Sequence, residues 1–423
     1  MSTSDLKANA NKKIKKAEAK QSKLYEKLAK WQLFGVKLFV GGGFDIVFVI
    51  LVFLLLTIGL VMMFSASYVS AKYDASVDYD PFHYIKKQLL FAVVGVIFMF
   101  ICSHINPEIY KKLTPAVFVI SLILLVVVLF AYERIPGKES FKRWLPIPVI
   151  GGTFQPSDIA KLGVIMAMAY VFNKYKKQIE TKWYVAVIIF LCLVSICLLI
   201  YAEHHLSCTV LVFGIGVGMM FLGGADKRWF ILGIALLIAG AILILFFRHE
   251  ILQPYQADRI DSLFVKNYDD TNDRWQTNQS LFALGSGGFF GLGLGNSVQK
   301  YLYMPEPQND FIFAIVGEEL GFFRSSLILI AFAILFFRGF TIAIKSNNMF
   351  ERLLVFGIML HIGLQTIFNI LVVTDMIPNT GISLPFFSAG GTALMMQLLE
   401  MGIVLSVSRT GERKLRKNEK SEQ

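Results

Sequence analysis

Long apolar segments recur along almost the whole chain, and each is close to the length of a membrane-spanning helix. A helix needs roughly 20 apolar residues to cross the hydrocarbon core of a bilayer. Ten such segments are predicted, at residues 45–66, 87–104, 113–132, 157–174, 183–202, 206–224, 228–247, 311–344, 353–376 and 388–408. The eighth is expected to begin with a short re-entrant or kinked stretch. The pattern predicts an all-α polytopic membrane protein, with residues 44–408 forming one helical bundle.

Basic residues cluster in the segments that fall on one side of these spans. They lie before residue 40, between residues 174 and 182, at Lys227 and Arg228, at Lys345 and Arg352, and between residues 409 and 420. By the positive-inside rule, both termini are predicted to be cytoplasmic. This placement accounts for the net charge of +11 without a nucleic-acid partner.

Two basic segments flank the predicted membrane domain, at residues 1–43 and 409–423. The first is not a cleavable signal, because its basic stretch is too long and the apolar segment after it is long enough to stay in the membrane. It is either a helix held at the inner leaflet by anionic lipid or a solvated tail that only orients the chain. The chain is 55% hydrophobic and only 17% charged, as expected for an integral membrane protein. Its four cysteines lie in or beside predicted spans without metal-ligand spacing, so they are interpreted as packing residues.

The longest loop, residues 248–310, lies on the outer side in this topology, between the seventh and eighth spans. A loop of this length is usually either functional or disordered. Its aromatic and glycine content argues against disorder. The stretch "GSGGFFGLGLGN" at 285–296 lacks the spacing of nucleotide-binding loops, so its glycines are predicted to permit tight turns and close backbone approach.

Three acids stand where this loop enters the eighth span: Asp310, Glu318 and Glu319. Asp310 follows two prolines that restrict the backbone, and it is interpreted either as a helix cap or as a catalytic carboxylate at the outer surface. Glu318 and Glu319 lie about two turns further in. They are expected either to pair with Lys161 or another inward base, or to shape a polar cavity.

Two further outer segments carry candidate site residues. The segment "KRWLPIPVIGGTFQPSDIAKLG" places Arg143 in a loop and Gln155, Ser157, Asp158 and Lys161 at the start of the fourth span. Asp158 and Lys161 share a helix face and are predicted to pair, either as a purely structural pair or, with Arg143, as a site for a phosphorylated lipid head group. The Pro- and Gly-rich segment "PNTGISLPFFSAGG" at 378–391 leads into the tenth span and contains Ser388.

Several of these motifs together resemble the SEDS family (shape, elongation, division and sporulation), in its FtsW and SpoVE branch rather than its RodA branch. The resemblance covers about residues 45–408. It rests on "SAS" at 65–67, "RWL" and "FQPSDIAKL" within 143–162, "PYQADRI" at 254–260, the block from Gln279 to Gly321, and "PNTGISLPFFSAGG". This chain departs from the family pattern at Asp158, where the family has Glu, at Ala389, where it has Tyr, and at "EHHLSC", residues 203–208, where a Pro-Asp-x-Gly motif is absent.

The resemblance implies a peptidoglycan glycosyltransferase that polymerises lipid II into glycan strands, with undecaprenyl diphosphate as leaving group. Asp310 falls on the family's catalytic aspartate. The residues expected to bind substrate are Arg143, Gln155, Ser157, Asp158, Lys161, Arg259, Gln279, Lys300, Glu318 and Ser388. A divalent cation, Mg²⁺ or Mn²⁺, could assist at the pyrophosphate; no metal ligand is assigned, and Asp310 is the candidate. A class B penicillin-binding protein, other division membrane proteins and a place at the division septum are also implied.

Two other functions fit a polar interior in a ten-helix bundle. The first is a flippase for lipid II, which would work by alternating access. The sequence shows no inverted repeat, and its distinctive residues lie at the outer face rather than at the membrane midplane. The second is a non-catalytic scaffold for the division machinery, against which the intact segment around Asp310 argues.

Overall fold

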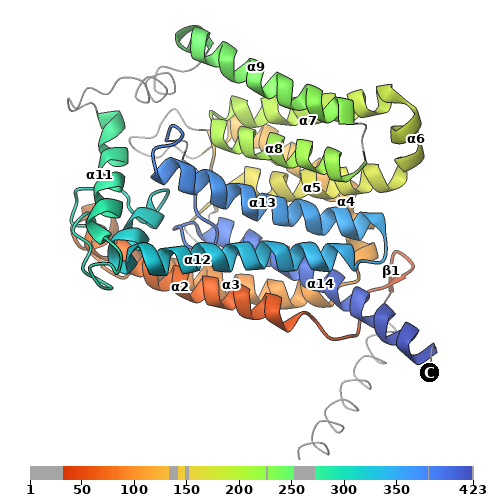
Figure 1. The fold of residues 1–423 in the computed structure, drawn as a ribbon, viewed down its shortest axis with the longest axis horizontal. Coiled ribbons are helices and arrows are strands. Elements are labelled where there is room, and N and C mark those ends of the chain that lie inside the picture. The colour runs from red at the N-terminus through yellow and green to blue at the C-terminus, as the bar shows by residue number, and fades with distance from the viewer. Residues whose placement is uncertain are drawn as a thin grey trace, which may run out of the picture.

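The protein is a bundle of long helices that run side by side, as the computed structural model shows (Figure 1). The structure describes residues 32–132, 142–147, 152–224, 227–251, 272–379 and 381–421. One helix corresponds to each predicted apolar segment: α2 (Ile46–Lys72), α3 (His83–His104), α4 (Pro107–Phe130), α5 (Pro156–Lys174), α7 (Trp183–Ala202), α8 (Leu206–Leu222), α9 (Lys227–Ile251), α12 (Ile312–Ile344), α13 (Met349–Val373) and α14 (Gly391–Ser421). The all-α polytopic prediction is therefore confirmed.

Seven helices of the described chain are long and apolar enough to cross a membrane on their own: α2, α3, α4, α7, α12, α13 and α14. Helix α8 is apolar but has only 17 residues, and α5 carries Asp158 and Lys161 in its first turns. Both helices pack inside the bundle. Neighbouring helices surround the short α8, and the ion pair between Asp158 and Lys161 compensates the two charges in α5.

Helix α12 is not continuous, which confirms the predicted kinked start of the eighth span. Gly321 interrupts it with φ 76° and ψ 174°, backbone angles that only glycine adopts easily. The helix thus has a short first part before Gly321 and a long apolar second part after it.

The interpretation of residues 248–310 as one irregular loop was wrong in part. The segment contains helix α11 (Asn272–Gly287), which packs against α12. Its average polarity is too high to resemble a span, but Ala283 and Ser280 on one face are fully buried. The C-terminal segment also differs from the prediction of a separate tail, because α14 continues as one helix to Ser421. A short helix, α6 (Lys176–Thr181), joins α5 to α7.

The few strands form two small hairpins. Strands β1 (Gln32–Leu33) and β2 (Val36–Lys37) pair antiparallel before α2. Strands β3 (Leu145–Ile147) and β4 (Gly152–Phe154) pair antiparallel before α5, with Leu145 opposite Phe154. The second hairpin leads directly into the polar N-terminus of α5.

The most extensive helix contact among the described residues joins α3 to α14, and small residues make it possible. A Cβ atom at Gly402 would lie 2.4 Å from the Met99 carbonyl oxygen, and one at Gly95 would lie 2.7 Å from Leu398. Small residues let membrane helices approach closely enough for van der Waals packing, which drives their association in lipid.

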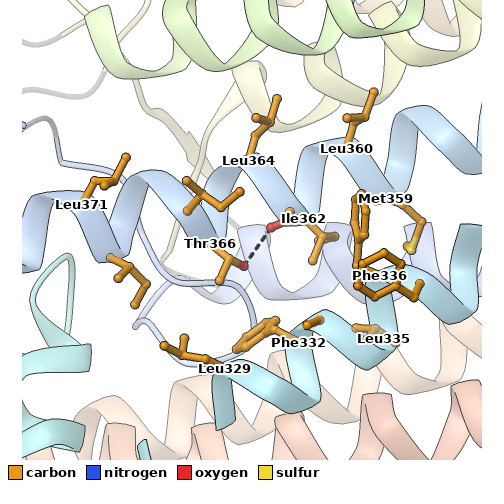
Figure 2. Close-up of a pocket in the computed structure, with 15 residues that line it drawn as sticks. Leu329, Phe332, Leu335, Phe336, Met359, Leu360, Ile362, Leu364, Thr366 and Leu371 are labelled. Carbon is orange, nitrogen blue, oxygen red and sulfur yellow. Dashed lines mark hydrogen bonds between the residues drawn. The ribbon is translucent and has the colours of Figure 1, made fainter. Parts of the chain in front are cut away.

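An apolar groove of about 410 Å³ lies between α12 and α13 (Figure 2). Its lining includes Phe332, Phe336 and Met359. The one hydroxyl in the lining, Thr366 Oγ1, donates a hydrogen bond of 2.8 Å to the Ile362 carbonyl. The groove therefore offers an almost entirely apolar surface.

Candidate active site

Asp310 sits in a turn two residues before α12, at the end of the bundle that also holds α11 (Figure 1). Asn369, a fully buried residue of α13, donates from Nδ2 to the carbonyl of Asp310 and to that of Ile382, both at 2.7 Å. The N-cap of α12 is Phe311, so the interpretation of Asp310 as the cap of this helix was wrong. The carboxyl group is partly exposed, while the backbone that carries it is held by a neighbouring helix.

The segment 377–390 is fixed to the same turn. The Ala389 amide donates to the Gln308 carbonyl at 2.8 Å, and Ser70 of α2 donates to Gln308 Oε1 at 3.3 Å. Because the bond to Ala389 uses only its backbone, the absence of the family's tyrosine there leaves this junction intact. Three elements therefore hold the position of Asp310: α2, α13 and the segment before α14.

Gly381 is the residue of this segment that approaches the carboxylate. Its φ is +70°, and a Cβ atom there would lie 3.2 Å from Asp310 Oδ2. The glycine is thus required twice, for its backbone conformation and for the space that it leaves to the carboxylate.

Gly381→Ala is expected to displace the Asp310 carboxylate by a few tenths of an ångström and to lower kcat by about 10-fold, because small misplacements of a reacting group slow catalysis strongly. Polymerisation of lipid II by purified protein, the activity that the sequence resemblance implies, measures the effect. Gly224→Ala is the matched control, since Gly224 also has positive φ (+83°) but no atom within 4 Å of its Cβ position. Equal activity of the two variants would show that the contact with Asp310 is irrelevant.

Glu318 and Glu319, both fully buried in the first part of α12, organise the outer loop. Glu318 accepts hydrogen bonds from the Val298 amide at 2.9 Å and from the Ser297 hydroxyl. Glu319 accepts from the Gly295 amide at 2.9 Å and from Ser65 Oγ of α2 at 2.7 Å. The two carboxylates thus satisfy loop backbone groups that would otherwise be buried without partners.

Lys300 is the inward base that pairs with Glu319, so the predicted alternative of a base other than Lys161 is confirmed. Lys300 Nζ lies 2.9 Å from Glu319 Oε1, and it also donates to the Gly295 carbonyl at 2.6 Å and to Ser65 Oγ at 3.2 Å. A cavity of about 320 Å³ beside this pair is lined by Tyr68, Lys300 and Tyr301, among others. Lys300 thus borders an open space, but Glu319 neutralises its charge.

The glycines of this loop allow the close approach that the sequence predicted. A Cβ atom at Gly291 would lie 2.3 Å from the Glu319 carbonyl oxygen, and one at Gly321 would lie 2.1 Å from the Gly291 nitrogen. The loop amides of Leu292 and Gly293 donate to the carbonyls of Glu318 and Glu319, each at 3.0 Å. These bonds satisfy carbonyls that the kink in α12 leaves free.

A second polar group lies at the start of α5. Asp158 and Lys161 form the predicted ion pair, at 2.8 Å, and both side chains are buried. Ser157 is fully buried beside them. Glu400 of α14 interacts electrostatically with Lys161 and lies 2.9 Å from His361 Nδ1 of α13. Titratable groups from α5, α13 and α14 therefore meet inside the bundle.

The turn between α7 and α8 extends this second group towards the surface. Gln155 Nε2 lies 3.1 Å from His205 Nδ1, and the Arg143 guanidinium donates to the His204 carbonyl. Glu203 is fully buried, and neither of its carboxyl oxygens has a hydrogen-bond partner among the described residues. Burial raises the pKa of Glu203 to about 8, and nearby Arg143 only partly counteracts the shift. The carboxyl group is therefore largely protonated at neutral pH.

The raised pKa of Glu203 makes stability depend on pH. The folded state binds a proton that the unfolded state releases above about pH 4.5, so stability falls as the pH rises from there to about 8. Glu203→Gln removes this dependence and is expected to stabilise the protein above pH 8 by at most about 5 kcal/mol. Thermal unfolding of both proteins in detergent between pH 5 and 9 measures it. A difference in Tm that stays constant with pH would contradict the assignment.

The remaining predicted site residues lie in different parts of the chain. Gln279 of α11 is buried, as is Ser388, whose Oγ accepts from the Leu384 amide at 2.7 Å and so holds the turn before α14. Arg259 lies outside the described residues. The structure thus groups five predicted residues around the start of α5: Arg143, Gln155, Ser157, Asp158 and Lys161. It places Lys300 and Glu318 in a separate cluster that holds the loop to α12.

The sequence reasoning missed the buried amides that hold the outer segments. Asn369 is one. Gln365 of α13 donates to the Ser383 carbonyl at 2.9 Å, Gln88 of α3 to the Ser388 carbonyl at 3.1 Å, and Gln397 of α14 accepts from the Phe386 amide at 3.0 Å. The available signal was the presence of an amide side chain within an apolar span, since a polar group there is costly unless it is bonded.

Taken together, the fold and the site define a polytopic membrane protein with a carboxylate whose backbone is held by a neighbouring helix, and with a buried ion pair inside the bundle. Comparison with known proteins places it further. The sequence profile of the cell cycle proteins FtsW, RodA and SpoVE matches residues 45–413. The chain belongs to this family.

Named relatives agree with this assignment. The chain is 38% identical to stage V sporulation protein E of Bacillus subtilis (strain 168), over 86% of this chain and 97% of that protein. It is 34% identical to a probable peptidoglycan glycosyltransferase FtsW of Geobacter sp. (strain M18), over 86% of this chain and 97% of that one.

Two solved structures share the fold. A chain of a peptidoglycan synthase complex that couples polymerisation and crosslinking matches with a TM-score of 0.68, over 87% of this chain and 98% of its own length. The rod shape determining protein RodA of Thermus thermophilus matches with a TM-score of 0.62, over 87% of this chain and 97% of its own. Each is 23% identical to this chain.

Proposed function

We propose that this protein is a peptidoglycan glycosyltransferase that polymerises lipid II, with Asp310 as its catalytic base. The observation that carries the proposal is the position of Asp310, a partly exposed carboxylate whose backbone is held at 2.7 Å by the buried Asn369. A base for sugar chemistry needs a fixed position and access to substrate from water, while the lipid tail of the substrate stays in the bilayer. The curated FtsW relatives carry this activity in their names.

The reaction joins the 4-hydroxyl of one lipid-linked disaccharide to the anomeric carbon of another. Asp310 accepts the proton of the hydroxyl, the new C–O bond forms, and the bond to the pyrophosphate breaks with its electron pair. The linkage changes from α to β, so one direct displacement suffices and no covalent sugar–enzyme intermediate forms. The product leaves as a longer glycan and a lipid diphosphate.

The leaving pyrophosphate needs positive charge. Arg143 and Lys161 border the second polar group at the start of α5, and Arg259 belongs to the outer loop. We assign Arg143 to this role and expect Arg259 to assist. Lys161 and Lys300 are less suited to it because Asp158 and Glu319 neutralise their charges. We propose that Gln155 and Ser157 shape the site beside Arg143 and that Gln279 and Ser388 shape the walls near Asp310.

A divalent cation is compatible with this arrangement. Among the described residues no three His, Cys, Asp or Glu side chains form a metal site. Mg²⁺ often binds through one or two carboxylates together with substrate phosphates, and Asp310 would supply the carboxylate here. The cation would supply charge neutralisation at the pyrophosphate.

The protein is a multi-pass membrane protein. We propose that it lies in the cytoplasmic membrane at the division septum, with both termini in the cytoplasm and Asp310 at the outer face. Strand β1 and the C-terminal end of α14 lie at the end of the bundle opposite α11, which supports a common side for both termini (Figure 1). A class B penicillin-binding protein is the proposed partner, since the matched peptidoglycan synthase complex couples polymerisation to crosslinking.

The test is polymerisation of labelled lipid II by protein purified in detergent, with and without a cognate transpeptidase. Detergent removes the membrane barrier, so glycan strands formed there cannot result from flipping. Long products support the proposal. If no product forms under either condition while the protein moves lipid II across proteoliposomes, the chain is a flippase; if neither activity is found, it is a scaffold.

A further inference from the structure

A second groove, of about 440 Å³, lies between α4, α5 and α7 and is separate from every residue assigned to glycan synthesis. It extends along α5 from Val164 to Tyr175, about 16 Å at 1.5 Å per residue. That length is close to half of a hydrocarbon core of about 30 Å. The groove therefore has the depth of one leaflet.

The inside of this groove is apolar. Phe118 of α4, Met168 of α5 and Ile189 of α7 belong to its lining. The hydroxyl of Thr114, which also lines it, already donates to the Tyr110 carbonyl at 2.9 Å. Pro115 lies within α4 at the groove and removes one helical hydrogen bond, which favours a bend at this point. A flexible hydrocarbon chain is the ligand that such a lining accepts.

The mouth of the groove is cationic. One end of the groove lies at α6, the short helix that joins α5 to α7 (Figure 1). Its lining there includes Tyr170, Tyr175 and, from α6, Gln178. The Lys174 ammonium lies over both tyrosine rings, 5.6 Å and 5.2 Å from their centres. Lys177 and Lys182 are exposed on the same connection. The two tyrosines therefore belong to the lining of the groove and also contact the Lys174 ammonium group.

We propose that this groove binds an anionic phospholipid of the leaflet on the side of the chain termini, with one acyl chain in the groove and the phosphate at Lys174, Lys177 and Lys182. A zwitterionic lipid would fill the same apolar space, but its own ammonium group would be repelled by the three lysines and would offset the attraction of its phosphate. Basic residues near a membrane surface each add attraction for anionic lipid, and here a pocket fixes where the chain must lie. The site is independent of the glycosyltransferase assignment.

The test places the full chain in nanodiscs that contain phosphatidylglycerol and phosphatidylcholine with identical acyl chains, and then measures the retained lipid by native mass spectrometry. Wild-type protein is expected to retain one phosphatidylglycerol selectively. The triple variant Lys174→Gln, Lys177→Gln, Lys182→Gln is expected to bind it at least about 10-fold more weakly. The matched control removes three exposed charges on the same side but away from the groove, in Lys37→Gln, Lys345→Gln, Arg352→Gln, and should retain it.

A second variant separates the groove from simple surface attraction. Ala167→Phe fills the lining while all lysines remain, and Ile188→Trp does the same at a side chain that is 54% exposed, so at least one of the two should fold. Loss of the retained lipid in a folded filling variant supports the proposal. Retention in folded filling variants, equal retention of phosphatidylcholine, or equal loss in the control triple variant would each overturn it.

Discussion

Asp310→Asn is expected to lower glycan polymerisation by at least about 100-fold, since loss of a general base typically costs between 100- and 10,000-fold. The substitution keeps the size of the side chain and leaves the Asp310 carbonyl free to accept from Asn369. The turn should therefore keep its backbone bond to Asn369 while the proton acceptor is lost. The measurement compares the initial rate of labelled glycan formation for wild type and variant at equal folded yield.

Glu306→Gln serves as the control for Asp310. Glu306 is an exposed acid of the same turn, where its Oε2 accepts from Asn309 at 2.8 Å, and an amide oxygen can accept that bond as well. This variant should keep nearly full activity. If both variants retain activity, Asp310 is not the base. If both lose it, the charge of the turn matters rather than a single proton acceptor.

Glu319→Gln is expected to destabilise the protein by about 3–5 kcal/mol, because removing one partner of a buried ion pair leaves the other charge without compensation. The charge left behind is the Lys300 ammonium, whose exposed side-chain fraction is only 5%. The loop is then expected to loosen at Gly295 and Ser297, because their amides donate to the two oxygens of the Glu319 carboxylate and an amide keeps only one oxygen as acceptor. Thermal unfolding followed by tryptophan fluorescence detects the change, and Trp275 reports on the loop through its bond to the Tyr303 carbonyl.

A double variant tests whether the pair itself is responsible. Glu319→Gln with Lys300→Met removes both charges, so it should regain a large part of the stability that either single variant loses. If the stability lost in the double variant equals the sum of the losses in the two single variants, the carboxylate acts through the loop amides alone. Lys161→Met is a poor substitute for Lys300→Met here, because Lys161 pairs with Asp158 instead.

The local features of the site were largely predictable from sequence. Prolines around Asp310 indicated a fixed turn, the i,i+3 spacing of Asp158 and Lys161 indicated their pair, and the glycines of the outer loop indicated close backbone approach. Each depends on neighbours a few residues apart or on the conformational limits of one residue type. The structure confirms the pair and the close approach.

The partners of buried polar groups could not be predicted in this way. Glu319 meets Lys300 and Ser65, and the second of these is 254 residues away. Asn369 joins Asp310 to Ile382 because α13 ends beside the start of α12. Apolar periodicity says that a span is buried but not which helix lies against it, so long-range partners remained open.

The sequence by itself determined that this chain crosses a membrane repeatedly, because runs of about 20 apolar residues have no other stable location. It also determined that acids at the loop–span junction require water or partners, because a carboxylate alone in lipid is too costly. Only the tertiary structure decided which acid keeps a partly exposed side chain and which acids are buried in holding the loop. Asp310 stays partly exposed above a bonded backbone, whereas Glu318 and Glu319 are buried among loop amides and Lys300. The physical reason is that the kink at Gly321 and the approach of Gly291 bring the loop onto α12, and neither contact can be read from the pattern of residues along the chain.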